Sequence, residues 1–214
     1  MTSNYYVYGV LEKTTLDLEV AGVEGASHVS TVDYPPFSAV VSDIDVEDPE
    51  ETDENARAHD DVLQAVMEHG GGHTVVPMQF GMVFDSARGV KNILRGGRRA
   101  FTKALRDTEG MVELGVKLVA EQDTDVDTET IREDAAERLA TVADEVAEGD
   151  LFSDLIVLNR SYLVAREKRE AFDEAVDELE ADYPDLRVQY TGPWAPYNFV
   201  DIEISGSRSN VPHR

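Results

Sequence analysis

The sequence predicts an α/β (α+β) protein made of two consecutive small domains, each a mixed sheet with packed helices, ferredoxin-like or a variant of that arrangement. Its 214 residues suffice for two domains of about 100 residues each. Hydrophobic residues make up 42% of the chain and charged residues 29%, so the chain has enough apolar side chains to form a packed core. Strand and helix patterns also alternate in both halves. We expect domains at residues 1–108 and 109–204, and a flexible polar tail at 205–214.

The first half is expected to contain strands where β-branched and aromatic residues cluster, at residues 4–11, 29–32, 38–42 and 73–78. A helix is predicted to begin at Asp48, because Pro49 and an acidic first turn follow, and to stop at the glycine run 70–72. After a loop at 79–84, a second helix is predicted from about residue 86 to 106.

The second half begins with a strand whose apolar residues, from Val112 to Leu118, alternate with polar ones. The remaining elements are expected in the order helix, strand, helix, strand, strand. They are a helix ending near Gly149, a buried strand within 155–165, a helix stopped by Pro184, and strands at 186–190 and 197–204.

Composition excludes several classes of function. The chain has no cysteine, which removes disulfides, zinc–thiolate sites, iron–sulfur clusters and cysteine nucleophiles. Its net charge of −25 disfavours nucleic acid and anionic membranes as partners. No secretion signal or membrane span is recognisable, which favours a cytoplasmic location. Acidic residues are spread along the chain and lysine is scarce, which favours a protein working in molar salt over an ordinary acidic protein.

No residue pattern indicates catalysis. His59, Asp60 and His73 could form part of a metal-dependent hydrolase site, but the other ligands of such a site are not recognisable. Nucleophile and phosphate-binding motifs are absent from the sequence. We therefore expect no catalytic residues, no metal and no cofactor.

A cationic helix stands out against this acidic background. Residues 85–106 carry seven basic residues and one aspartate, a net +6, whereas residues 1–84 carry −14 and residues 107–214 carry −17. The basic side chains fall opposite an apolar face that includes Gly97, where we expect close backbone approach to the sheet. The basic face can dock an acidic protein, or it can neutralise acidic segments of the same chain. We include Arg95, Arg98 and Arg99 among the partner-binding residues.

Two loops are rich in aromatic residues. Residues 77–84 contain Phe80 and Phe84, and residues 190–199 contain Trp194, the only tryptophan, and Tyr197. The prolines of the second loop make it stiff, and a stiff aromatic loop binds a partner at low entropic cost. Alternatively, these rings are part of the core. As candidates for partner binding we take Phe80, Phe84, Trp194 and Tyr197.

The same two loops, PMQFG at 77–81 and YTGPWAPYNF at 190–199, resemble signature segments of the gas vesicle protein F/L family. The opening strand YYVYGV and the segment FSAVVS at 37–42 also resemble that family, and the resemblance extends from about Asn4 to Ile204. Within the family, the sequence is most similar to the F proteins of salt-loving archaea.

This resemblance implies a non-enzymatic accessory or minor structural protein of gas vesicles. The implied partners are the small hydrophobic shell protein and other accessory gas vesicle proteins, and the implied location is the gas vesicle or the cytoplasm. We expect an assembly factor that binds shell protein and limits its aggregation while a vesicle nucleates. The alternatives are a small-molecule-sensing α/β module and the metal-dependent hydrolase considered above.

Overall fold

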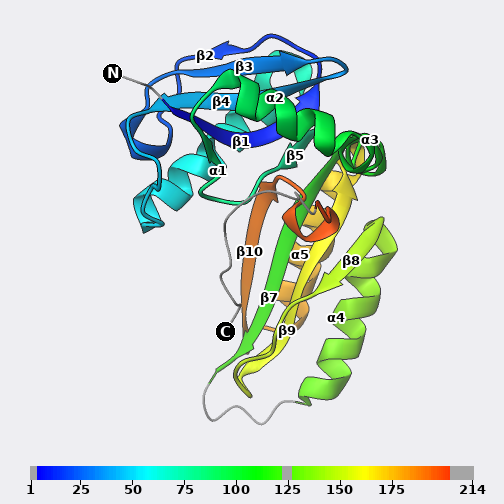
Figure 1. Cartoon of the computed structure of the whole chain (residues 1–214). Helices are drawn as coiled ribbons and strands as arrows, with labels where there is room; N and C mark the ends of the chain where they lie inside the picture. Colours follow the sequence, from blue (N-terminus) through cyan, green and yellow to red (C-terminus); the bar gives the residue numbers. More distant parts are fainter. Residues whose placement is uncertain (1–3, 122–126, 203–214) are drawn as a thin grey trace. The chain divides into compact units, whose positions relative to one another are not determined.

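A computed structural model describes residues 4–121 and 127–202 (Figure 1). The described residues fall into two compact units, one formed by residues 4–109 with 200–202 and the other by residues 110–199. The predicted tail at 205–214 lies outside the described residues. Within the described ranges, no helix is both long and apolar enough to cross a membrane.

The first unit is a sheet with helices on both faces. Its strands are β1 (Asn4–Glu12), β2 (Asp17–Leu18), β3 (Val29–Tyr34), β4 (Phe37–Ile44), β5 (Val75–Pro77) and β6 (Val83–Phe84). The sheet order is β2-β3-β4-β1-β5, and β6 also pairs with β1. Its helices are α1 (Asp53–Glu68), α2 (Ala87–Gly96) and α3 (Arg98–Asp107). Tyr6 of β1 contacts α1, whereas the next residue, Val7, belongs to the core beneath α2 and α3. Successive side chains of a strand point to opposite faces of the sheet, so β1 contributes to the packing on both faces.

Three local details of this unit differ from the prediction. Helix α1 is capped by Thr52, whose side chain accepts a hydrogen bond from the backbone N–H of Asn55, and not by Asp48. The helix predicted over 86–106 is divided in two at Gly97. Strand β6 also occupies the end of the segment expected to be a loop, because Val83 and Phe84 pair with β1.

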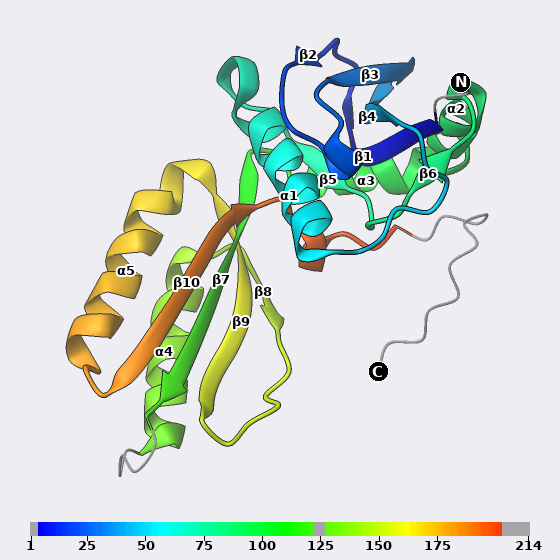
Figure 2. The ribbon, with the colours of Figure 1, turned by 90° about the vertical axis from the view of Figure 1, so that its left-hand side faces the viewer.

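The second unit has the element order β-α-β-β-α-β. Its elements are β7 (Met111–Ala120), α4 (Thr128–Val142), β8 (Glu145–Glu148), β9 (Ile156–Ala165), α5 (Arg169–Asp182) and β10 (Leu186–Trp194). The sheet order is β10-β7-β9-β8, and both helices lie on one face (Figure 2). Apolar residues of β7 and β9 form the core with α4 and α5. This order and layering is the ferredoxin-like arrangement, which confirms the predicted fold class.

The sheets were expected to be mixed, but every strand pairing among the described residues is antiparallel. In the second unit, each helix connects two strands that are not neighbours in the sheet, so neither crossover produces a parallel pair. The two strands joined by each helix do run in the same direction, because both are antiparallel to the strand that lies between them. The expectation of a mixed sheet failed because these strands are not neighbours.

Two predictions for the second unit were wrong. The helix expected to reach Gly149 ends at Val142, because residues 145–148 pair with β9 as strand β8. The strand expected at 197–204 is a 3₁₀ turn at Tyr197–Phe199 followed by residues without regular structure up to 202. In that turn the N–H of Phe199 bonds locally to the carbonyl of Pro196 instead of to a neighbouring strand.

Candidate protein-docking surface

Helices α2 and α3 form the basic segment singled out in the sequence. The side chain of Ser86 caps α2 by accepting a hydrogen bond from the N–H of Gly89 at 3.3 Å. The inward-facing residues are buried; they are Val90, Leu94, Phe101, Ala104 and Leu105. The predicted apolar face is thereby confirmed across both helices.

The two helices meet at Gly97, which ends α2 and precedes α3. A Cβ atom built on Gly97 would lie 2.5 Å from the Phe101 ring, which is itself fully buried. The close approach expected at Gly97 is therefore to an aromatic ring of the next helical turn and not to the sheet. Glycine is needed here because the ring occupies the space of a side chain.

Alanine substitutions at the adjacent residues Gly96 and Gly97 are expected to change the free energy of unfolding in opposite directions. Gly97→Ala should lower the free energy of unfolding by about 1–3 kcal/mol, because its methyl group overlaps the Phe101 ring. Gly96→Ala is the matched control. A Cβ on Gly96 meets nothing within 4 Å, so alanine should stabilise the helix by up to about 1 kcal/mol. Urea unfolding of both variants in molar KCl measures the difference, and equal effects would contradict this account of Gly97.

The outward face of α2 and α3 is basic and accessible. All seven of its cations are exposed; they are Arg88, Lys91, Arg95, Arg98, Arg99, Lys103 and Arg106. The first five form no ion pair with any described residue, although the chain has an excess of 25 negative charges. Neutralisation by acidic segments of the described chain therefore does not account for this surface. Three of the predicted partner-binding residues, Arg95, Arg98 and Arg99, lie on it.

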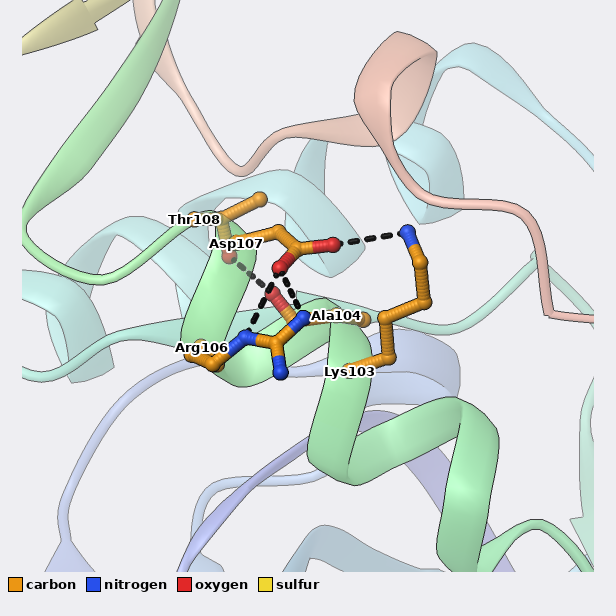
Figure 3. A network of polar contacts seen from close by, with 5 residues as sticks. All are labelled: Lys103, Ala104, Arg106, Asp107 and Thr108. Carbon is orange, nitrogen blue, oxygen red and sulfur yellow. Dashed lines mark hydrogen bonds and ion pairs between the residues drawn. The ribbon is translucent and has the colours of Figure 1, made fainter.

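A network of polar contacts lies at the C-terminal end of α3, at the edge of the basic surface (Figure 3). Asp107 pairs with the Lys103 ammonium at 2.7 Å and with the Arg106 guanidinium at 2.8 Å. The hydrogen bond from Lys103, and then that from Arg106, hold the pKa of the Asp107 carboxyl below its usual value. The Thr108 hydroxyl donates to the carbonyl of Ala104 at 2.9 Å. Two of the seven cations are thus used within the chain.

The aromatic residues of the first unit contribute more to packing than to the surface. Phe80 is half-buried, and its ring lies 5.7 Å from that of Tyr6 and 6.0 Å from that of His59. Phe84, also half-buried, belongs to β6 and packs against the core beneath α2 and α3. Only their exposed portions remain accessible to a partner.

In the second unit, the aromatic loop folds back across its own sheet. The carboxylate of Glu113 on β7 accepts hydrogen bonds from the backbone N–H of Asn198 at 2.9 Å and from its side-chain amide at 2.5 Å. These two bonds hold the turn that contains Tyr197, whose side chain is exposed. Trp194, at the end of β10, is half-buried. The loop therefore presents Tyr197 more fully than Trp194.

The histidine considered as a metal ligand has a different role. His59 is buried on α1, and its Nδ1 accepts a hydrogen bond from the Tyr6 hydroxyl at 2.7 Å. That hydroxyl in turn accepts from the backbone N–H of Gly81 at 3.3 Å. Burial lowers the pKa of His59 to about 4, so the ring is neutral at pH 7. No cluster of three potential metal ligands occurs among the described residues.

Sequence reasoning missed one exposed apolar pair. Leu151 and Phe152 lie between β8 and β9, and their side chains are 49% and 74% exposed. Their only signal in the sequence is an apolar pair flanked by the turn-forming residues Gly149, Asp150, Ser153 and Asp154.

Comparison with known proteins shows the family. The family model described as gas vesicle synthesis protein GvpL/GvpF matches residues 4–135 and 120–201. Gas vesicle protein F1 of Halobacterium salinarum is 54% identical over 208 residues, covering 97% of this chain and 98% of that protein. Gas vesicle protein F of Haloferax mediterranei is 54% identical over 209 residues, with the same coverage.

Solved structures agree with the fold. The crystal structure of GvpF from an Anabaena species superimposes with a TM-score of 0.83 at 21% identity, covering 97% of this chain and 100% of that one. The predicted resemblance to the gas vesicle protein F/L family is therefore confirmed, and the chain belongs to the GvpL/GvpF family of gas vesicle synthesis proteins.

Proposed function

We propose that the protein is a non-catalytic assembly factor of gas vesicles that binds the small hydrophobic shell protein and limits its aggregation during nucleation. Family membership supports the role in gas vesicle formation. The observation that carries a docking role is the α2–α3 surface, where five exposed cations have no ion pair with any described residue. Such a surface on an acidic protein is suited to an acidic face of another protein.

Arginine suits this role in concentrated salt. Salt at molar concentration reduces the Debye length to about 3 Å, so long-range attraction is lost and only groups in direct contact interact. A guanidinium still forms bidentate, directional hydrogen bonds with a carboxylate at contact. Four of the five cations that lack an ion pair with a described residue are arginines. Apolar side chains should supply much of the affinity under these conditions, and the accessible candidates are Tyr197 and, in part, Trp194.

The test is capture of shell protein by the tagged protein in molar KCl, after co-expression of the two. The unsubstituted protein should recover shell protein. The Arg98→Glu, Arg99→Glu double variant should recover at least several-fold less, because it reverses two neighbouring charges of the surface. Trp194→Ala should also reduce recovery. Arg57→Glu is the control, since Arg57 is an exposed arginine on α1, outside the surface.

The outcomes separate the function from the site. Normal recovery by the folded double variant and by Trp194→Ala would contradict the assignment of the surface while retaining the function. Failure of the folded, unsubstituted protein to recover shell protein would contradict shell-protein binding itself. Equal losses in the double variant and in Arg57→Glu would indicate a general charge effect and not a docking site.

A further inference from the structure

The second sheet has a polar hollow on the face opposite α4 and α5. The apolar side chains of β7 that pack against these helices, from Val112 to Leu118, alternate with residues that point to the other face. On that face the strand register places residues side by side in two successive rows. One row is Thr191, Gly115 and Ser161, and the next is Gln189, Lys117 and Asn159. A hollow of about 250 Å³ is lined by both rows.

Gly115 forms the floor of the hollow. Its two neighbours in the row, Thr191 and Ser161, both carry hydroxyl groups. A Cβ atom built on Gly115 would lie 2.6 Å from the Thr191 Oγ1, so this hydroxyl lies beside the space that the glycine leaves empty. The Ser161 hydroxyl accepts a hydrogen bond from the Asn198 side-chain amide at 3.1 Å, so its own proton can donate to a ligand. Two hydroxyl groups therefore flank the floor, one from each adjacent strand.

The Lys117 ammonium at the hollow lacks a carboxylate partner. It forms no ion pair with any described residue, although the chain has 44 acidic side chains. Lys117 is half-buried, and its Nζ lies 5.2 Å from the centroid of the Phe152 ring. A half-buried ammonium has lost part of its hydration, and an anion in the hollow would replace the lost interactions with a charge-assisted hydrogen bond.

The other charged groups that line the hollow already have partners. The Arg160 guanidinium pairs with Glu148 at 2.6 Å. Both carboxylate oxygens of Glu113 accept hydrogen bonds from Asn198. Glu113 is four residues from Lys117 along β7, which is about 14 Å in a strand and several times the Debye length of ~3 Å in molar salt. The charge that remains for a ligand is therefore the single positive charge of Lys117.

The two ends of the hollow differ in chemistry. Lys117 and the Gln189 amide beside it can both donate hydrogen bonds at one end. The half-buried indole of Trp194 lines the hollow at the other end, where Trp194 pairs with Glu113. An aromatic wall with a few polar groups is typical of small-molecule sites. The volume is below the ~300–1,000 Å³ of pockets for drug-sized molecules, so a ligand must be smaller than these.

We propose that the hollow binds a small organic carboxylate, with its carboxylate on Lys117 and its flat apolar part against Trp194. One uncompensated ammonium matches the single charge of a carboxylate. The strand backbone around the hollow is used in sheet pairing, so it does not offer the loop or helix N–H groups that commonly bind phosphate. Chloride at molar concentration competes for the ammonium alone, so selectivity comes from the hydroxyl groups, the Gln189 amide and the indole.

The experiment titrates the unsubstituted protein with benzoate in molar KCl and follows the fluorescence of Trp194, the only tryptophan of the chain. Benzoate joins a carboxylate to a flat ring, and a ligand of about ten non-hydrogen atoms should bind saturably with a dissociation constant in the millimolar range. Benzamide, its uncharged counterpart, should bind at least about tenfold more weakly, because it offers Lys117 no charge. Inorganic phosphate should not displace benzoate at an equal concentration.

Two variants test the site itself. Lys117→Met removes the ammonium, and Gly115→Ala fills the floor with a methyl group that meets only the Thr191 hydroxyl, so both should fold. Each should weaken benzoate binding by at least about tenfold. Lys13→Met, at an exposed lysine of the first unit, is the matched control and should bind normally.

The proposal is overturned if benzoate does not bind saturably, if benzamide binds equally well, or if folded Lys117→Met binds benzoate normally. Displacement of benzoate by phosphate would contradict the assignment to a carboxylate. Lys117 and Gly115 are not among the residues assigned to shell-protein binding, so failure here leaves the proposed function standing. Loss of shell-protein capture would in turn leave the benzoate result unchanged.

Discussion

Replacing Phe101 with alanine is expected to lower the free energy of unfolding by about 3–5 kcal/mol. The Phe101 ring is fully buried beneath α3, and its centroid lies 5.9 Å from that of Phe37 in an edge-on contact. It also fills the space beside Gly97 where α2 meets α3. Alanine would leave a cavity lined by strand and helix residues that are fixed by the sheet, so relaxation can recover only part of the loss.

Urea unfolding in molar KCl, monitored by circular dichroism, measures this effect. Phe152→Ala is the matched control, because it removes the same ring from a site that is 74% exposed. Phe152→Ala should lower the free energy of unfolding by less than about 1 kcal/mol, because the ring is already mostly in water in the native protein. The one contact that is lost is the exposed cation–π contact with Lys117. Similar losses in the two variants would contradict the placement of Phe101 in the core.

Lowering the pH from 7 to 4 is expected to remove about 3 kcal/mol of stability through His59 alone. Burial lowers the pKa of His59 from 6.5 to about 4, and each unit of difference corresponds to about 1.4 kcal/mol. Between these values the unfolded chain binds a proton that the native protein does not. Stability is therefore complete above pH 6.5 and decreases as the pH falls toward 4. Protonation would also prevent Nδ1 from accepting the Tyr6 hydrogen bond.

The measurement compares the unsubstituted protein with His59→Gln by urea unfolding at a series of pH values. Titration of the 44 carboxyl groups is common to both proteins and cancels in the difference. His59→Gln should be the less stable at pH 7, and the difference should shrink by about 3 kcal/mol by pH 4. A constant difference between His59→Gln and the unsubstituted protein would show that His59 is not buried in its neutral form.

Features that depend on local periodicity were determined by the sequence alone. The spacing of Val90 and Leu94 predicted which face of α2 is buried, and the opposite placement of Arg95, Arg98 and Arg99 predicted their exposure. These predictions succeed because helical periodicity places residues three and four apart on the same face, whatever lies beyond the helix. The family was also recognisable, because its loop motifs are contiguous in the chain.

Features that depend on distant partners were decided only by the tertiary structure. Residues 145–148 become a strand because β9 lies beside them, and the turn at Tyr197–Phe199 forms because Glu113, 85 residues away from Asn198, binds it. His59 is a core residue because Tyr6, 53 residues away, occupies its Nδ1. The partial burial of Phe80 and the exposure of Phe152 likewise depend on which surfaces the folded chain covers. No local pattern encodes such contacts, since each depends on a partner brought close only by folding.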